Sequence, residues 1–184
     1  MSKAYKPKAP GAMTSVKTLR KNARANLDQG AVTVTYRCDR QAVIRHLNDA
    51  LATELVCVLR YRRHHYMAKG LASKSTATEF LVHSSEELGH ADLIAERIVQ
   101  LGGEPDFAPD SLTKRSHSEY VAAASLVGMI KENLVAERIA IDSYRELIDY
   151  IGDGDSTTKK MLESILRVEE EHADELADLL GGAS

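Results

Sequence analysis

Two short motifs in this sequence pair a carboxylate with an imidazole at a spacing that suits a metal ion. They are Glu87-x-x-His90 and Glu169-x-x-His172. Side chains three residues apart lie on the same face of a helix, so each pair can bind one ion. One such pair means little, because Glu and His are common on exposed helix faces. Two pairs in one chain predict a two-metal site.

The two motifs belong to an internal repeat. The segment LATEL at 51–55 resembles LVAER at 134–138, and ELGHAD at 87–92 resembles EEEHAD at 169–174. Each half contains a glutamate that precedes a tyrosine by seven residues, and that glutamate precedes its motif by 33 or 32 residues. Two facing copies of one helical hairpin predict a nearly symmetric site. The residues concerned are Glu54 and Tyr61 in the first half, and Glu137 and Tyr144 in the second.

The four glutamates interrupt apolar stripes of helical spacing, at positions where packing requires an aliphatic side chain. Isolated ionised carboxylates in a dry core cost several kcal/mol each, and no Lys or Arg lies in the central part of these stripes. Two divalent ions neutralise four such charges, with neutral histidines as nitrogen ligands. This ligand set suits iron, manganese or zinc, and it matches the inventory of di-iron carboxylate bundles. The candidate ligands are Glu54, Glu87, His90, Glu137, Glu169 and His172.

The elements that position these residues are four long helices, which predict an all-α fold. Capping residues and glycines mark their ends, with Asp39 as the first N-cap and a sequence at Thr76 and Glu79 that resembles a capping box. Two short connections and one crossover of about fifteen residues favour the ferritin-like arrangement of a four-helix bundle. We expect an N-terminal arm over 1–38 and the bundle over 39–182. The helices are expected from 39 to 70, from 76 to 102, from 117 to 152 and from 155 to 181.

The N-terminal arm is basic, and the rest of the chain is acidic. Residues 1–27 carry seven basic residues and no acid, whereas the remainder has a net charge of −10. We expect residues 1–12 to be disordered, a short helix from about 14 to 29, and an extended run over 31–37. Two interpretations stay open: a DNA-binding surface, and an arm that solubilises the protein or packs on a neighbouring subunit.

Composition indicates one soluble domain with ordinary apolar and charged fractions, 43% and 28%. Only Cys38 and Cys57 are present, without a C-x-x-C pair, so a zinc ribbon or rubredoxin-type iron site is excluded. We expect both thiols to be reduced in the cytoplasm. The longest apolar stretch, around 121–130, is too short to span a bilayer, and the first residues lack the apolar core of a signal peptide.

From about residue 40 to residue 180 the chain resembles bacterioferritin and related ferritin-like proteins. The segments LNDALATEL, EELGHADLIAERI, LVAERIAIDSY and EEEHADEL carry the resemblance. The resemblance implies that Glu87 and Glu169 bridge two irons and that Glu54 and Glu137 are terminal ligands. It also implies one iron each for His90 and His172, with Tyr61 in an auxiliary position close to the pair.

Two departures from bacterioferritin modify what the resemblance implies. Leu88 occupies the position of the family's haem-ligating methionine, so we expect no haem by that route. After the fourth helix we expect no fifth helix of the kind that lines the channel of 24-subunit cages. We therefore expect a homo-oligomeric shell of twelve subunits rather than twenty-four, like that of the DNA-protecting Dps-like mini-ferritins, in a subgroup that keeps a bacterioferritin-type site inside each bundle.

The resulting hypothesis is a ferroxidase that oxidises Fe²⁺ with O₂ or H₂O₂ and stores the product in its shell. The alternatives are a DNA-binding stress-protection shell and a di-manganese catalase or peroxidase. We interpret His64, His65 and His83 as solvated or capping histidines on a helix face rather than access or storage ligands, and Cys57 as a buried thiol. The flanking Glu86 and Glu170 are expected to be outer or surface acids.

Overall fold

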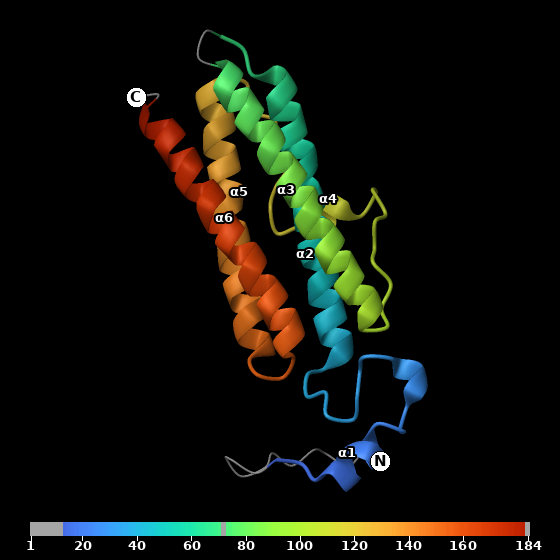
Figure 1. Cartoon of the computed structure of the whole chain (residues 1–184). Helices are drawn as coiled ribbons and strands as arrows, with labels where there is room; N and C mark the ends of the chain where they lie inside the picture. The colour runs from blue at the N-terminus through green and yellow to red at the C-terminus, as the bar shows by residue number, and fades with distance from the viewer. Residues whose placement is uncertain (1–12, 71–72, 183–184) are drawn as a thin grey trace.

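The fold is a bundle of long helices, as the computed structural model of residues 13–70 and 73–182 shows (Figure 1). No strand occurs among these residues, so the all-α prediction is confirmed. Short helices precede the bundle and lie within its crossover. The elements are α1 (Val16–Asn22), the 3-10 helix η1 (Leu27–Gln29), α2 (Arg40–Met67), α3 (Ser73–Gln100), α4 (Leu112–Arg115), α5 (Leu126–Ile151) and α6 (Ser156–Gly182).

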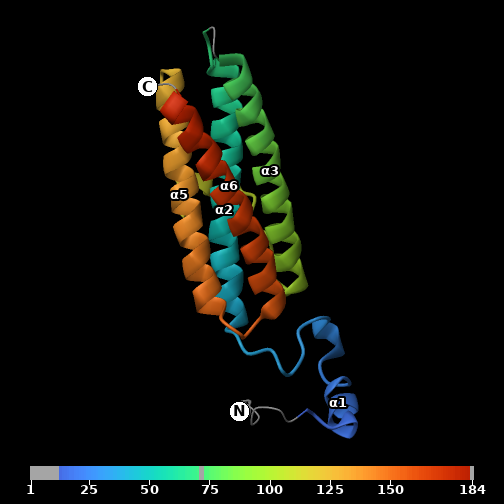
Figure 2. The ribbon, with the colours of Figure 1, turned by 60° about the vertical axis from the view of Figure 1, so that its left-hand side comes forward.

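The four long helices form two antiparallel hairpins, α2 with α3 and α5 with α6. A long crossover that contains α4 passes along α2 and joins the hairpins, so that α2 and α6 run in one direction and α3 and α5 in the other (Figures 1 and 2). The crossover is necessary because α5 begins at the end of the bundle opposite to the end of α3. Among the described residues, no helix combines the length and the apolar character that crossing a bilayer requires.

Local signals explain where the helices begin. The Asp39 carboxylate accepts a hydrogen bond from the Ala42 backbone N–H at 3.1 Å and caps α2, as predicted. At the start of α6, the Asp155 carboxylate accepts one from Thr158 N–H at 3.0 Å. After α3, Gly102 adopts a φ of 76°, which other residues rarely adopt.

The prediction that the third helix begins directly after Ser116 is wrong. The helix α5 begins at Leu126, where Ser125 caps it by accepting a hydrogen bond from Gly128 N–H at 3.1 Å. The preceding segment is held open because its backbone carbonyls accept hydrogen bonds from arginines of α2. Arg60 donates to the Glu119 carbonyl at 3.1 Å, and Arg63 donates to the Ala122 carbonyl. A continuous helix would direct those carbonyls along its own axis instead.

The N-terminal segment is less regular than predicted. The expected helix over 14–29 is divided into α1 and η1 by Asn26, which has a left-handed φ of 53°. The run 31–37 forms turns instead of an extended strand, because Tyr36 N–H donates to the Thr33 carbonyl at 3.0 Å. The disorder predicted for residues 1–12 lies outside the described residues.

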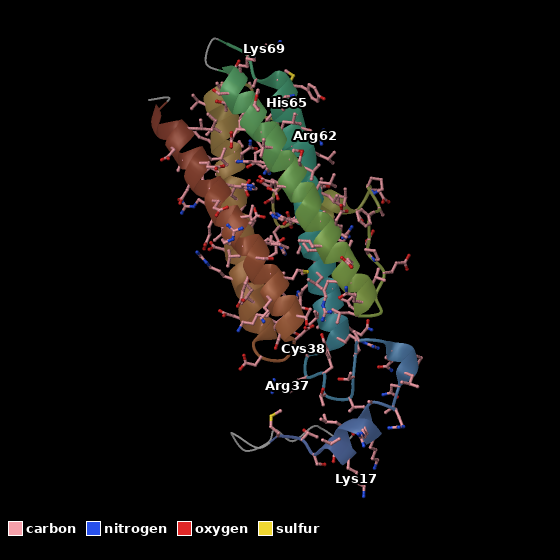
Figure 3. The ribbon with its side chains drawn as sticks, in the orientation of Figure 1. Lys17, Arg37, Cys38, Arg62, His65 and Lys69 are labelled. Atoms are coloured by element: carbon pink, nitrogen blue, oxygen red, sulfur yellow. The ribbon has the colours of Figure 1, made fainter. Side chains whose placement is uncertain are left out.

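The turns bring Cys38 to the end of the bundle, near the α5–α6 connection (Figure 3). Its thiol donates to the Ile151 carbonyl at 3.6 Å. A Cβ atom added at Gly154 would lie 2.3 Å from the Cys38 sulfur, so that turn needs a glycine for close approach. Tyr36 adds a hydrogen bond from its hydroxyl to Asp155 at 3.1 Å.

The bundle interior contains two apolar clusters at opposite ends with a polar layer between them, and a third, small cluster packs α2 against Leu112 of α4. One cluster contains Leu51, Ile98 and Ile165, and the other contains Phe80, Ile130 and Leu176. The apolar stripes of α2, α3 and α6 are buried except at Leu179, near the end of α6, which is partly exposed. In the stripe of α5, Val127 near the start of the helix is 37% exposed.

Candidate metal centre

The polar layer contains one glutamate from each long helix. The four side chains are almost completely inaccessible, with residue exposures of 1%, 1%, 0% and 0% for Glu54, Glu87, Glu137 and Glu169. His90 and His172, one helical turn after the glutamates of α3 and α6, are also buried. The structure therefore brings all six residues singled out from the sequence into one buried layer.

The six residues form two overlapping groups of potential ligands. In each group, one donor atom per residue lies within 4.8 Å of every other. Both groups contain Glu87 and Glu169, whereas the remaining glutamate and histidine differ. The groups are Glu54, Glu87, His90 and Glu169, and Glu87, Glu137, Glu169 and His172. The geometry is that of two adjacent ion sites that share two carboxylates.

Most of the unpaired polar atoms in the protein interior belong to this layer. In the described part of the chain, nine buried side-chain nitrogen and oxygen atoms have no hydrogen-bond partner, and seven of them belong to these six residues. His90 Nδ1 lies only 2.8 Å from Glu169 Oε1, but the contact lacks the geometry of a hydrogen bond. Such orphaned atoms are costly in a dry interior, and a bound cation satisfies them together. The donor set fits divalent metal ions.

The electrostatics of the layer favour cations. Burial raises the pKa of Glu87 and Glu169 well above the usual range, and the charges of neighbouring glutamates raise it further. Burial alone lowers the pKa of His90, but Glu169 and Glu54 raise it to about 10. Without metal, the cluster therefore retains protons, and cations that bind must displace them.

Two tyrosines orient the outer carboxylates. The Tyr61 hydroxyl donates to Glu137 Oε1, and the Tyr144 hydroxyl donates to Glu54 Oε1. The second oxygen of each carboxylate is among the orphaned atoms, so it is free for a cation. Burial raises the pKa of both tyrosines far above 10, which keeps them neutral donors. Hydrogen bonds to the outer carboxylates therefore account for both hydroxyls.

Other candidates from the sequence lie outside the two groups. The expectation of a solvated or capping histidine is wrong for His64, which is buried with Nδ1 3.0 Å from the Asn133 side-chain oxygen. His65 Nδ1 lies 2.6 Å from the Ala77 carbonyl. Burial raises the pKa of Cys57 to about 12, so this thiol stays protonated. The thiol accepts a hydrogen bond from Arg60 at 3.4 Å.

Glu86 lies behind a histidine of the centre, which is the outer position that the sequence analysis expected. For His83 the expectation of a solvated or capping histidine is wrong, because this residue is buried beside the centre. Glu86 Oε2 lies 2.9 Å from His172 Nε2, while His172 Nδ1 faces the shared carboxylates. A carboxylate on the second ring nitrogen is the usual way to orient a metal-binding histidine. His83 stacks on His172 with ring centroids 4.0 Å apart. Glu170, by contrast, pairs with Arg145 at 2.6 Å on the exposed surface.

Sequence reasoning missed two features near the centre. Arg60 is only 1% exposed and donates to the Asn133 side chain at 3.0 Å, although nothing in its local pattern marks it as interior. Glu79 and Glu175 lie beside His83, and the i, i+4 spacing of Glu79 and His83 was the available signal. Glu175 comes from another helix and gave no local signal.

A protein-family model described as a ferritin-like domain matches residues 44–183. The bacterioferritin of Rhodobacter capsulatus is 33% identical over 134 residues, which cover 72% of this chain and 78% of that protein. Its structure, described as having a metal-free dinuclear site and a haem iron, has a TM-score of 0.70 at 29% identity. That match covers 79% of this chain and 86% of the other.

Two further proteins are similar to this chain. The structure of a bacterioferritin-related protein from Bacteroides fragilis, described as a dodecameric thioferritin, has a TM-score of 0.77 at 32% identity. That match covers 80% of this chain and 89% of the other. A nutrient stress-induced DNA-binding protein of Synechococcus is 30% identical over 137 residues, covering 73% of this chain and 78% of that protein.

Proposed function

This chain belongs to the ferritin-like family, and from that premise we propose that it is a ferroxidase that also stores iron. Iron storage and ferroxidase chemistry are the functions that the family and the bacterioferritin relatives support. The finer statement concerns this chain's own residues: we propose that two Fe²⁺ ions bind as substrates in the buried polar layer. The ligands are Glu54, Glu87, His90, Glu137, Glu169 and His172.

One observation carries the proposal. Two groups of four buried donors overlap at Glu87 and Glu169, and seven of their atoms have no hydrogen-bond partner. A structural role for the layer would be served better by aliphatic side chains, because a buried charge cluster without cations is destabilising. Two shared carboxylates also hold two ions close together, which a two-electron oxidation requires.

The proposed reaction balances with either oxidant. Two Fe²⁺ each give up one electron to O₂, which takes two protons from solvent and leaves as H₂O₂. With H₂O₂ as oxidant, the same two electrons and two protons yield two molecules of water. Glu87 and Glu169 hold the two ions at a fixed separation, and the hydroxyls of Tyr61 and Tyr144 orient the outer carboxylates.

The test is Fe²⁺ oxidation under air by the apo-protein, beside variants of the proposed ligands. We expect Glu54→Ala and His172→Ala to lower the initial rate more than about 10-fold, since even loss of an orienting partner costs 10- to 100-fold. Glu163→Gln is a matched control, because Glu163 is an exposed acid on α6. Equal rates for all four proteins, or for the wild type and buffer, contradict the proposal.

Manganese and zinc suit the same donors, so the metal must be tested directly. A di-manganese catalase would release O₂ from H₂O₂ with manganese bound and would form no iron core. We also propose that haem is not bound through position 88, because Leu88 offers no ligand atom. A haem absorption band in the purified protein would contradict this.

We also propose that the protein is cytoplasmic, because both cysteines are free thiols.

We propose a shell of twelve subunits as the storage compartment. The support is the similarity to the Bacteroides fragilis protein, which is described as dodecameric and matches 80% of this chain. Light scattering with a particle image should give twelve copies of the 20.2 kDa chain. A particle of twenty-four copies contradicts this part of the proposal without affecting the metal centre.

A second candidate function is DNA binding by the arm. Residues Lys17, Arg20, Lys21 and Arg24 lie on or just after α1, which extends away from the bundle end, and Lys17 is labelled there in Figure 3. Repeated over a shell, these charges would bind DNA phosphates without sequence preference and with strong salt dependence. A gel shift that persists after all four residues are changed to Gln contradicts this function.

A further inference from the structure

His83 is a buried histidine that the two-metal centre does not use. It lies one helical turn before Glu87 and is buried. Its Nδ1 is 3.2 Å from the Tyr61 hydroxyl oxygen. Its Nε2 is 2.8 Å from Glu175 Oε2 on α6 and 3.5 Å from Glu79 Oε1 on α3. Glu79, His83 and Glu175 form a further group of potential ligands beside the centre.

The two ring nitrogens of His83 face different partners. Tyr61 donates its hydroxyl proton to Glu137, so its oxygen can accept from His83 Nδ1–H. On the other side of the ring, Nε2 forms a hydrogen bond with Glu175 Oε2 and also faces Glu79 Oε1. A divalent ion can take the place of the proton between Nε2 and these two carboxylates. The arrangement is that of an imidazole that can bind metal through Nε2 together with two carboxylate oxygens.

The group is accessible from solvent on the side of its carboxylates. The His83 side chain is 1% exposed, whereas those of Glu79 and Glu175 are 38% and 54% exposed. Both glutamates line a surface pocket of about 590 Å³ that α3, α5 and α6 enclose, with Ile130 of α5 and Asp178 of α6 among its other lining residues. An ion from solution can therefore reach the carboxylates first and the buried imidazole next.

The internal repeat shows that packing alone does not require these residues. His83 lies four residues before Glu87, and the matching position four before Glu169 is Ile165, which is also buried. The position matching Glu79 is Met161, and the position matching Glu175 is Leu93. All three ligand-type residues thus occur on one side of a nearly symmetric centre. The other side has three apolar residues instead.

We propose that Glu79, His83 and Glu175 form a third binding site, for a divalent transition-metal ion. One imidazole nitrogen and two carboxylate oxygens suit Fe²⁺, Zn²⁺ or Co²⁺. The site supplies ions to the two-metal centre from the α3–α6 side, a role that rests on the proposed function. Donors lie continuously between the two: His83, Glu86 and His172 also have ligand atoms within 4.8 Å of one another.

The binding test uses Zn²⁺ soaked into crystals of the whole oligomer, with anomalous maps at the zinc edge. The wild type and the surface control Glu163→Gln should show a peak beside His83 Nε2 in addition to peaks in the centre. The double variant E79Q/E175Q should lose that peak and keep those of the centre. No peak beside His83 in the wild type, or a full peak in the double variant, overturns the third site.

This experiment separates the two proposals. Empty maps at the six central residues with a peak beside His83 would remove the two-metal centre and leave the third site. The transfer role has its own test, in which stopped-flow absorption follows Co²⁺ loading of the apo-oligomer. We expect about 10-fold slower loading of the centre in E79Q/E175Q, since acidic funnels raise cation on-rates by 10-fold or more. An unchanged loading rate overturns the transfer role.

Discussion

Tyr61 on α2 donates its hydroxyl proton to Glu137 on α5, 76 residues further along the chain. The relationship is reciprocal, because Tyr144 on α5 donates to Glu54 on α2. Each tyrosine follows a glutamate of its own helix by seven residues, yet it contacts the glutamate of the other hairpin. The two hairpins therefore position each other's outer carboxylates, and neither hairpin contains a complete centre.

Replacing either tyrosine by phenylalanine tests this exchange. We expect Tyr61→Phe and Tyr144→Phe each to weaken Zn²⁺ binding at the centre by about 10- to 100-fold, because each releases one carboxylate from its orienting donor. Competition titration against a chelator measures the effect. The two variants should differ in Zn²⁺ binding beside His83, because only Tyr61→Phe removes the hydroxyl that contacts His83 Nδ1. Wild-type affinity in both variants would contradict the orienting role.

Substituting a shared carboxylate and substituting a single histidine should have different effects on the number of bound metal ions. Glu87 belongs to both ligand groups, whereas His172 belongs to one. We expect Glu87→Gln to lose both ions of the centre and His172→Ala to retain the ion on the side of Glu54 and His90. Anomalous maps with Zn²⁺ resolve the positions directly. Loss of a single ion in Glu87→Gln would show that this carboxylate does not bridge.

Removing metal should destabilise the protein. A ligand that binds only the folded state at 1,000 times its Kd contributes about 4 kcal/mol, so Tm should rise steeply as Zn²⁺ is added to the apo-protein. Glu87→Gln should lack most of this increase. Since burial and the neighbouring glutamates raise the pKa of Glu87 well above its usual range, this carboxyl is neutral without metal, and a neutral amide in its place should leave the apo form at least as stable as the wild-type apo form. Calorimetry of both proteins with and without Zn²⁺ measures these Tm values, and an equal rise in both would contradict the prediction.

A buried ion pair between Arg97 and Asp155 should make the free energy of unfolding depend on pH in the acidic range. Arg97 on α3 donates to Asp155, at the start of α6, at 2.9 Å and to Thr158 at 2.8 Å. Burial alone raises the pKa of Asp155, but hydrogen bonds from Thr158 and Arg97 lower it below 3.8. The stabilisation is therefore present above about pH 4 and is lost as the pH falls through the folded-state pKa.

Urea unfolding at several pH values tests this ion pair. We expect Asp155→Ala to lower the free energy of unfolding by about 3 kcal/mol at pH 7, because it leaves a buried guanidinium without its partner. The difference from wild type should shrink below pH 4. Asp153→Ala is the matched control, since the Asp153 side chain in the same turn is 96% exposed. A similar loss in both variants would assign the effect to the turn rather than to the pair.

Periodicity made the bundle and the buried glutamates predictable. A glutamate such as Glu169, at helical spacing among leucines and isoleucines, must face the bundle interior together with them. The prediction of an all-α bundle was confirmed. The metal role of these residues stays a prediction. The pairing of Tyr61 with Glu137 rather than Glu54 was not predictable, because seven residues of separation allow contact within the helix or across the bundle.

Contacts between distant segments account for what the sequence did not reveal. The late start of α5 depends on Arg60 and Arg63, which bind carbonyls of a segment about sixty residues away. His83 has an i, i+4 neighbour in Glu79, but its 2.8 Å contact with Glu175 requires α3 and α6 to be adjacent. Local patterns contain no information on such partners.

The polar layer divides the apolar interior into two clusters that share no residue. Cooperative unfolding of such a bundle depends on the continuity of the long helices and on whatever connects the clusters through the layer. When cations are absent, the two ends should open in hydrogen exchange as weakly coupled units, each with its own protection. When cations are bound, the amide protons of both ends should exchange through one common opening reaction. Iron would then join the two ends into one cooperative unit as well as being a substrate.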